Sequence, residues 1–147
     1  MKITMLICSI MAIFALSNCA NHTAAPPPKT ETTVVQAAVY QKISAKEAKQ
    51  MMDEGGDFIL LDVRTAEEFA EKRIAGAILI PDFEIAARAA AELTDKDARI
   101  LVYCRSGRRS ALAAQALADL GYTNVYDFGG ITSWPYETVS GEESKED

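Results

Sequence analysis

Apolar and polar residues alternate in blocks through the middle of the chain. Short continuous apolar runs are typical of strands covered on both faces. Such runs lie at 58–63, 77–80, 99–103 and 123–126. The segments between them are predicted to be helical, at 44–54, 65–72, 83–93 and 110–120. Because strands and helices alternate, the pattern predicts an α/β fold whose parallel sheet has helices on both faces.

Capping signals mark where these helices begin and end. Ser44 with Glu47, and Thr65 with Glu68, have the spacing of a capping box, in which each residue binds the other's backbone N–H. Gly121 stands where the helix at 110–120 is expected to end. These signals support the predicted order of elements independently of the apolar runs.

The N-terminal segment has a different composition. Residues 3–16 are mainly apolar, too short to cross a bilayer comfortably and about right for the core of a signal peptide. The four residues at 16–19, Leu-Ser-Asn-Cys, resemble the lipobox of bacterial lipoproteins, in which Cys19 would be lipidated. Asn18 departs from the small residue usual before that cysteine. An ordinary secretory signal and an uncleaved anchor are the alternatives.

The composition therefore divides the chain into four parts. We predict a signal peptide at 1–18, a lipidated cysteine with a Pro/Thr-rich tether at 19–39, one domain at 40–138 and an acidic disordered tail at 139–147. We expect export and lipid anchoring in the cell envelope on the periplasmic side. Ala20 after the cysteine leans toward the outer membrane.

Charge and cysteine content narrow the possible functions. The formal net charge of −6 argues against nucleic acid as the main partner. His22, the only histidine, lies in the tether, which argues against a metal site and leaves the domain no histidine as general base. Cys8 falls in the signal peptide and Cys19 would be acylated, so Cys104 is an unpaired thiol in the predicted domain.

The candidate site begins at Cys104. This cysteine ends an apolar run, and it is followed by a short basic loop and an alanine-rich helix. Backbone N–H groups, a helix N-terminus and guanidinium groups all favour the reactive thiolate. A buried structural cysteine beside a solvated basic face is the alternative. The conjunction within seven positions favours a reactive or anion-binding loop, formed by Arg105, Ser106, Gly107, Arg108, Arg109 and Ser110.

Four motifs in order give this chain a family resemblance. They are Leu60–Phe69, Ile74–Pro81, Val102–Ser110, and the segments 121–126 and 129–134. Together, over about residues 42–136, they resemble a rhodanese domain. The resemblance implies a three-layer domain with a central five-stranded parallel sheet and a cysteine that carries a sulfane sulfur as a persulfide. By position, Cys104 would be the carrier and residues 105–109 its cradle.

Two positions depart from the family's pattern. Lys72-Arg73 and the following Ile-Ala-Gly-Ala at 74–77 stand where the family commonly has Gly-His and Ile-Pro-Gly-Ala, and we expect only a small effect on stability. Arg108 replaces a smaller polar residue and would strengthen the cationic field of the loop.

The resulting hypothesis is sulfur transfer through a Cys104 persulfide. The donor would be a small molecule such as thiosulfate, and the acceptor cyanide or a thiol, including a protein thiol. No cofactor is needed for this chemistry, and a monomer is expected. For Asp62 and Arg64 we weigh active-site orientation against an ion pair that holds the strand end to the next helix, and favour the ion pair.

Two other classes of function remain open. A cysteine phosphatase or arsenate reductase would have an arginine six residues after the cysteine, where this chain has Ser110, while Arg109 comes one position earlier. The shorter loop favours a sulfur atom over a tetrahedral phosphate. A membrane-tethered sulfur carrier or protein-binding module with little turnover is the other alternative.

Overall fold

The computed structural model describes residues 39–141 of the chain. The predicted signal peptide, Cys19, nearly all of the tether and residues 142–147 lie outside the described residues. Within 39–141, no helix combines the length and the apolar character needed to cross a membrane.

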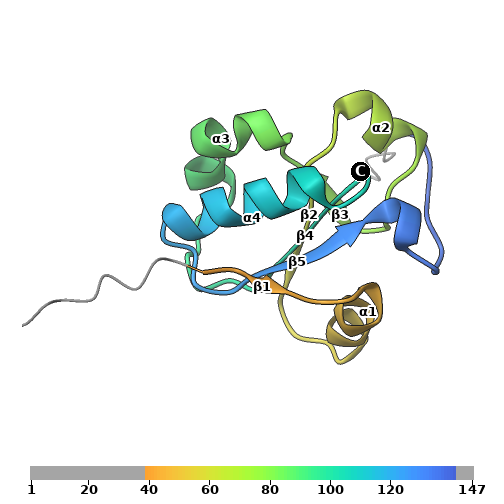
Figure 1. Ribbon diagram of the computed structural model, residues 1–147, viewed down its shortest axis with the longest axis horizontal. Coiled ribbons are helices and arrows are strands. Elements are labelled where there is room, and N and C mark those ends of the chain that lie inside the picture. The colour runs from red at the N-terminus through yellow and green to blue at the C-terminus, as the bar shows by residue number, and fades with distance from the viewer. Residues whose placement is uncertain (1–38, 142–147) are drawn as a thin grey trace, which may run out of the picture. The chain divides into compact units, whose positions relative to one another are not determined.

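One parallel sheet forms the centre of the domain (Figure 1). Its strands within residues 39–141 are β1 (Gln41–Lys42), β2 (Ile59–Asp62), β3 (Ala77–Leu79), β4 (Ile100–Cys104) and β5 (Val125–Gly130). Their order is β1-β5-β4-β2-β3, and each pair of neighbours is parallel. The prediction of a five-stranded parallel sheet is confirmed. β4 is its central strand, so the residue that ends β4 has neighbours on both sides.

Helices cover both faces of this sheet. α1 (Ala45–Asp53) lies on one face, and α3 (Ile85–Glu92) and α4 (Arg108–Asp119) lie on the other (Figure 1). α2 (Ala66–Glu71) follows β2, and short 3-10 helices, η1 (Asp82–Glu84) and η2 (Ile131–Ser133), precede α3 and follow β5. Both predicted capping boxes are present, at the starts of α1 and α2. They fix the directions in which the two helices leave the strand ends.

The side chains of β4 alternate between two apolar clusters. Ile100, Val102 and Cys104 belong to the cluster under α3 and α4, whereas Leu101 and Tyr103 belong to the cluster on the α1 side. All five residues are buried. Successive side chains of a strand point to opposite faces, so this register places the Cys104 thiol in the same layer as α4.

The aromatic residues near the C-terminus are part of the core. Phe128 and Trp134 lie in the α1-side cluster, and their ring centroids are 5.4 Å apart. The sequence-based interpretation of both residues as core and pocket wall agrees with this burial.

Three element boundaries differ from the prediction. β1 was not predicted, because its two residues are exposed and carry no apolar pattern. α4 begins at Arg108, two residues before the expected start, since Gly107 serves as its N-cap. β5 continues through Gly129 and Gly130, which we had placed in the final segment. The last two differences bring the loop and the glycine pair into contact.

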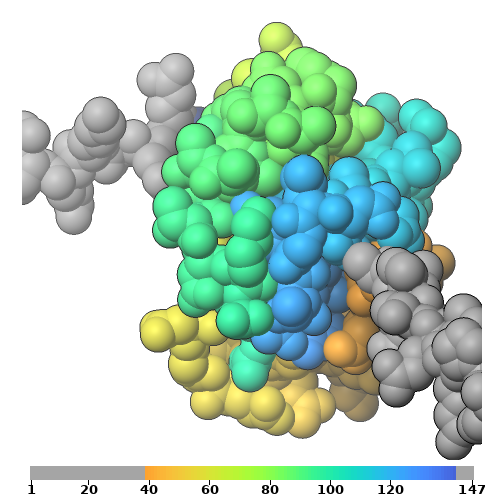
Figure 2. Space-filling model, turned by 90° about the vertical axis from the view of Figure 1, so that its left-hand side faces the viewer, coloured from red at the N-terminus to blue at the C-terminus, as the bar shows by residue number. Residues whose placement is uncertain are grey.

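The segments that follow α3 and α4 lie side by side at one end of the domain (Figure 2). The Tyr122 hydroxyl lies 2.8 Å from the carbonyl oxygen of Ala89 and 2.6 Å from that of Leu93, and it can donate to either. The backbone N–H of Thr123 donates to the carbonyl of Lys96. These bonds tie the C-terminal end of α4 to the rest of its layer.

Residues 139–141, which the sequence assigns to the tail, lie against α2. Val139 and Arg73 exchange two backbone hydrogen bonds of 2.8 Å, and the N–H of Gly141 donates to the carbonyl of Ala70. The buried Arg73 guanidinium also donates to the carbonyl of Gly141. The tail's first residues are therefore held by a side chain distant in sequence, which local composition does not reveal.

Candidate active site

The candidate site lies at the carboxyl end of β4, where Cys104 ends the strand and α4 begins four residues later. Gly107, the N-cap of α4, has a φ of 100°, in the left-handed region that favours glycine. This conformation lets its backbone N–H point back at the strand end. The N–H donates to the Cys104 sulfur over 3.0 Å. The loop thus forms a concave set of donors at a helix N-terminus, an arrangement suited to an anion.

The electrostatic environment of the thiol favours the thiolate. Burial raises the pKa of Cys104, but hydrogen bonds from the Ser110 backbone and hydroxyl, and from the backbones of Gly107 and Ser106, lower it by more. The pKa therefore lies below the ordinary value for a thiol. The largest lowering contributions come from these hydrogen bonds rather than from the arginines. Because the thiolate is the nucleophile, the loop activates Cys104.

Ser110 joins the loop to β5. Its hydroxyl oxygen lies 3.2 Å from the carbonyl of Gly107 and 3.2 Å from that of Gly129, and it also faces the Cys104 sulfur. A hydroxyl carries one proton, so it serves one of these acceptors at a time. Ser110 is fully buried, which gives this choice of acceptor a direct effect on the charge of the sulfur.

The backbone of the loop touches β5 at Gly130. A Cβ at Gly130 would lie 2.3 Å from the Arg105 carbonyl oxygen and 2.6 Å from the Ser106 Cα. Thr132 in η2 holds the same carbonyl, with hydrogen bonds of 3.2 Å from its N–H and 2.9 Å from its hydroxyl. The ladder between β4 and β5 shifts register here, pairing Cys104 with Gly130. Gly130 and Thr132 therefore set the position of the first half of the loop.

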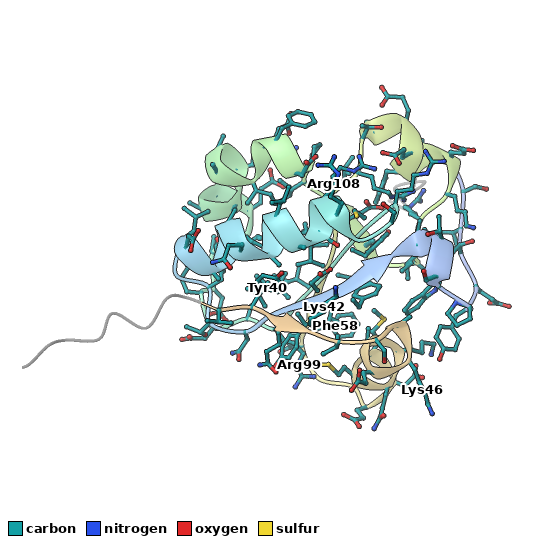
Figure 3. The ribbon with its side chains drawn as sticks, in the orientation of Figure 1. Tyr40, Lys42, Lys46, Phe58, Arg99 and Arg108 are labelled. Carbon is teal, nitrogen blue, oxygen red and sulfur yellow. The ribbon has the colours of Figure 1, made fainter. Side chains whose placement is uncertain are left out.

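The three arginines of the loop do not have equivalent surroundings. Arg109 forms a two-bond ion pair with Glu68 of α2, at 2.8 and 2.9 Å. The Arg109 guanidinium accordingly lowers the pKa of Glu68. Arg105 and Arg108 are exposed, and neither side chain has a charged partner among the described residues. Figure 3 shows Arg108 at the N-terminal end of α4.

Asp62 and Arg64 form a buried ion pair at the end of β2. Three of its hydrogen bonds run from the Arg64 side chain to the Asp62 carboxylate at 2.6–3.0 Å, and the Arg64 guanidinium also donates to the carbonyl of Lys72. Burial lowers the pKa of Arg64, but the bonds to Asp62 outweigh it and raise the pKa overall. The pair links the strand end to the end of α2, the geometry of the ion-pair interpretation.

The structure brings some predicted residues together and adds others. Cys104, Ser106, Gly107 and Ser110 meet around the sulfur, whereas Arg109 is drawn toward α2. Sequence reasoning missed Glu68 as the partner of Arg109, since we had assigned it only to a capping box. It also missed Gly130 and Thr132 as supports of the loop. Among residues 39–141, no cluster of three His, Cys, Asp or Glu side chains could hold a metal ion.

A nucleophilic cysteine in an N–H-lined loop after the central strand of a parallel α/β sheet defines a class of sulfur- or anion-handling domains. The family model of the rhodanese-like domain matches residues 44–136. This chain therefore belongs to the rhodanese-like family.

The similar proteins include sulfurtransferases. The thiosulfate sulfurtransferase PspE of Escherichia coli (strain K12) is 37% identical over 81 residues, which are 55% of this chain and 78% of that protein. The putative sulfur carrier protein YrkF of Bacillus subtilis (strain 168) is 35% identical over 103 residues, 69% of this chain, and the match spans 55% of YrkF. A solved rhodanese with anions from E. coli is 36% identical, with a TM-score of 0.53 over 56% of this chain and 98% of that one.

Proposed function

We propose that this protein is a sulfurtransferase of the thiosulfate type, with Cys104 as the sulfur carrier. The observation that carries the proposal is the Cys104 sulfur at the focus of N–H and hydroxyl donors, which lower its pKa. Relatives named as thiosulfate sulfurtransferases support the choice of donor.

The first half-reaction charges the cysteine. The Cys104 thiolate attacks the outer sulfur of thiosulfate, a new S–S bond forms, and the bond within thiosulfate breaks. Sulfite leaves with the electron pair of that bond. The loop N–H groups that stabilise the thiolate then face the negative charge of the persulfide, so little reorganisation is required.

The second half-reaction discharges it. Cyanide or a thiolate attacks the outer sulfur of the persulfide, and the electron pair of the broken S–S bond returns to Cys104 as a thiolate. The exposed Arg105 and Arg108 provide positive charge at the rim of the loop, which attracts anionic reactants.

Intact mass measurement after incubation with thiosulfate tests the proposal. The full-length protein should gain the mass of one sulfur atom, and cyanide should remove it with release of thiocyanate. Cys104→Ser should abolish both the adduct and turnover, because no other cysteine lies in residues 39–141. An adduct that persists in Cys104→Ser would refute the assignment of the carrier.

A slow sulfur carrier is the second candidate, and the similarity to YrkF favours it. The thiol is 1% exposed, which limits how readily a large acceptor reaches it. A single turnover as fast as in the thiosulfate type, followed by slow release to cyanide, would identify the carrier.

We also propose that Cys19 carries the lipid that anchors the protein in the cell envelope. The lipobox-like residues before it and the Pro/Thr-rich tether after it support this proposal.

A further inference from the structure

A small pocket opens beside the catalytic loop, between α2 and η2. Its volume is about 230 Å³. Pockets for drug-sized ligands measure about 300–1,000 Å³, so this one suits a smaller group. Arg105 contributes to its wall and directly follows Cys104 in the chain, with consecutive Cα atoms about 3.8 Å apart. A molecule in this pocket would therefore lie next to the sulfur.

The charges that line the pocket fall into two groups. Arg64 and Glu68 are already neutralised by ion pairs with Asp62 and Arg109. The other charged side chains of the lining are exposed and form no ion pair within residues 39–141. They are Glu71, Lys72 and Arg105. The free charges thus include both signs within one small pocket.

The remaining wall is apolar and polar by turns. Ile131 is buried and offers an apolar contact, and the Thr132 hydroxyl donates to the Arg105 carbonyl. That bond fixes the backbone from which the Arg105 side chain starts. The pocket and the sulfur cradle consequently share one rigid support.

From this arrangement we propose that the pocket binds the sulfur acceptor, and that it selects an amino-acid thiol carrying both a carboxylate and an ammonium group. The inference rests on the proposed function and specifies its acceptor. The carboxylate would lie near Arg105 and Lys72, and the ammonium near Glu71. An anionic donor requires only positive charge, so the carboxylate of Glu71 distinguishes an acceptor site from a donor site.

The transfer is balanced with this acceptor. The amino-acid thiol loses its proton to solvent, and its thiolate attacks the outer sulfur of the Cys104 persulfide. The bond between that sulfur and Cys104 Sγ breaks, and its electron pair restores the Cys104 thiolate. The product is the persulfide of the amino acid.

A binding titration tests the pocket without any sulfur transfer. L-Serine, the oxygen analogue of cysteine, is added to ¹⁵N-labelled full-length protein and backbone amide shifts are recorded. Shifts should concentrate at Glu71, Lys72, Arg105 and Thr132. The probes 3-hydroxypropionate and ethanolamine each lack one charge and should bind about threefold more weakly, as exposed ion pairs are weak. Equal binding of the three probes, or shifts elsewhere, would overturn the proposal.

Variants then connect binding with transfer. In thiosulfate-charged protein, the rate with L-cysteine is divided by that with 3-mercaptopropionate, after correction for the thiolate fraction. Glu71→Gln should lower this ratio about threefold, since it removes the partner of the ammonium. Lys46→Gln, an exposed change on α1 far along the fold (Figure 3), should leave it unaltered. An unchanged ratio in Glu71→Gln refutes the acceptor site. Failure of thiosulfate to charge the protein would instead refute the proposed function.

Discussion

Replacing Gly130 by alanine should displace the catalytic loop. Gly130 has a φ of −118°, which any residue adopts, so the substitution adds no backbone strain of its own. Its effect is steric. The new Cβ would lie 2.3 Å from the Arg105 carbonyl oxygen and 2.8 Å from the Arg105 carbonyl carbon. Both atoms are backbone, so no flexible side chain can rotate away.

The size of the effect follows from these distances. Carbon and carbonyl oxygen approach to about 3.3 Å at closest, so the strand and loop must separate by about 1 Å. Forcing extra volume into packed structure costs about 1–3 kcal/mol. That cost leaves a domain of ordinary stability folded. A displacement of about 1 Å at a reacting centre lowers rates by about 100-fold. We therefore expect a folded protein with sulfur transfer reduced about 100-fold.

Single-turnover persulfide formation with thiosulfate measures the rate, and urea denaturation measures stability. Gly121→Ala is the matched control. Gly121 has a φ of 90°, so alanine costs about 1–2 kcal/mol there, yet nothing lies within 4 Å of the new Cβ. It should lose stability but keep its rate. Persulfide formation in Gly130→Ala within about threefold of the unmodified protein would show that this contact does not position the loop.

Four further predictions concern the thiol, the ion pair, the reaction class and the anchor. Alkylation of Cys104 should have a midpoint below the ~8.5 of a free thiol, because its lowered pKa preserves the thiolate to lower pH, and Ser110→Ala should raise that midpoint. An ordinary midpoint in the unmodified protein would contradict the activation. Asp62→Asn should cost about 3–5 kcal/mol in urea denaturation, because it leaves Arg64 buried without its counter-ion, and a loss below about 1 kcal/mol would rule out that account. Hydrolysis of an aryl phosphate should be negligible beside sulfur transfer, and rapid phosphate release would reverse the ranking of the two reactions. Full-length protein should partition into detergent, and Cys19→Ala should abolish this partitioning or block processing. Unprocessed, water-soluble native protein would show that the N-terminus is misinterpreted.

Local signals in the sequence predict the fold well. The capping residues Ser44 and Thr65 act on N–H groups three positions away, so their effect can be predicted without the tertiary structure. The apolar runs at β2 and β4 likewise require only burial on both faces. β1 has no such signal, because its stability comes from pairing with β5, at the far end of the domain sequence.

The site was predictable where it is local and unpredictable where it is not. Cys104 and the residues up to Ser110 form one continuous turn, so their spacing alone indicates a cradle. The partner of Arg109 is 41 positions away, and the carbonyl of Arg105 meets Thr132, 27 positions away. Which side chain neutralises which loop arginine is decided by packing of α2 and η2 against the loop, and no local pattern encodes it.

Burial of the thiol also controls its oxidation. A disulfide between two copies of this chain through Cys104 would need the two sulfur atoms to approach to about 2.05 Å. Each sulfur lies within its own loop, and the residue is 1% exposed, so two folded copies cannot bring them together. Small reactants are not limited in this way. The same recess that activates the cysteine therefore prevents covalent dimerisation through it in an oxidising environment, without a second cysteine to protect it.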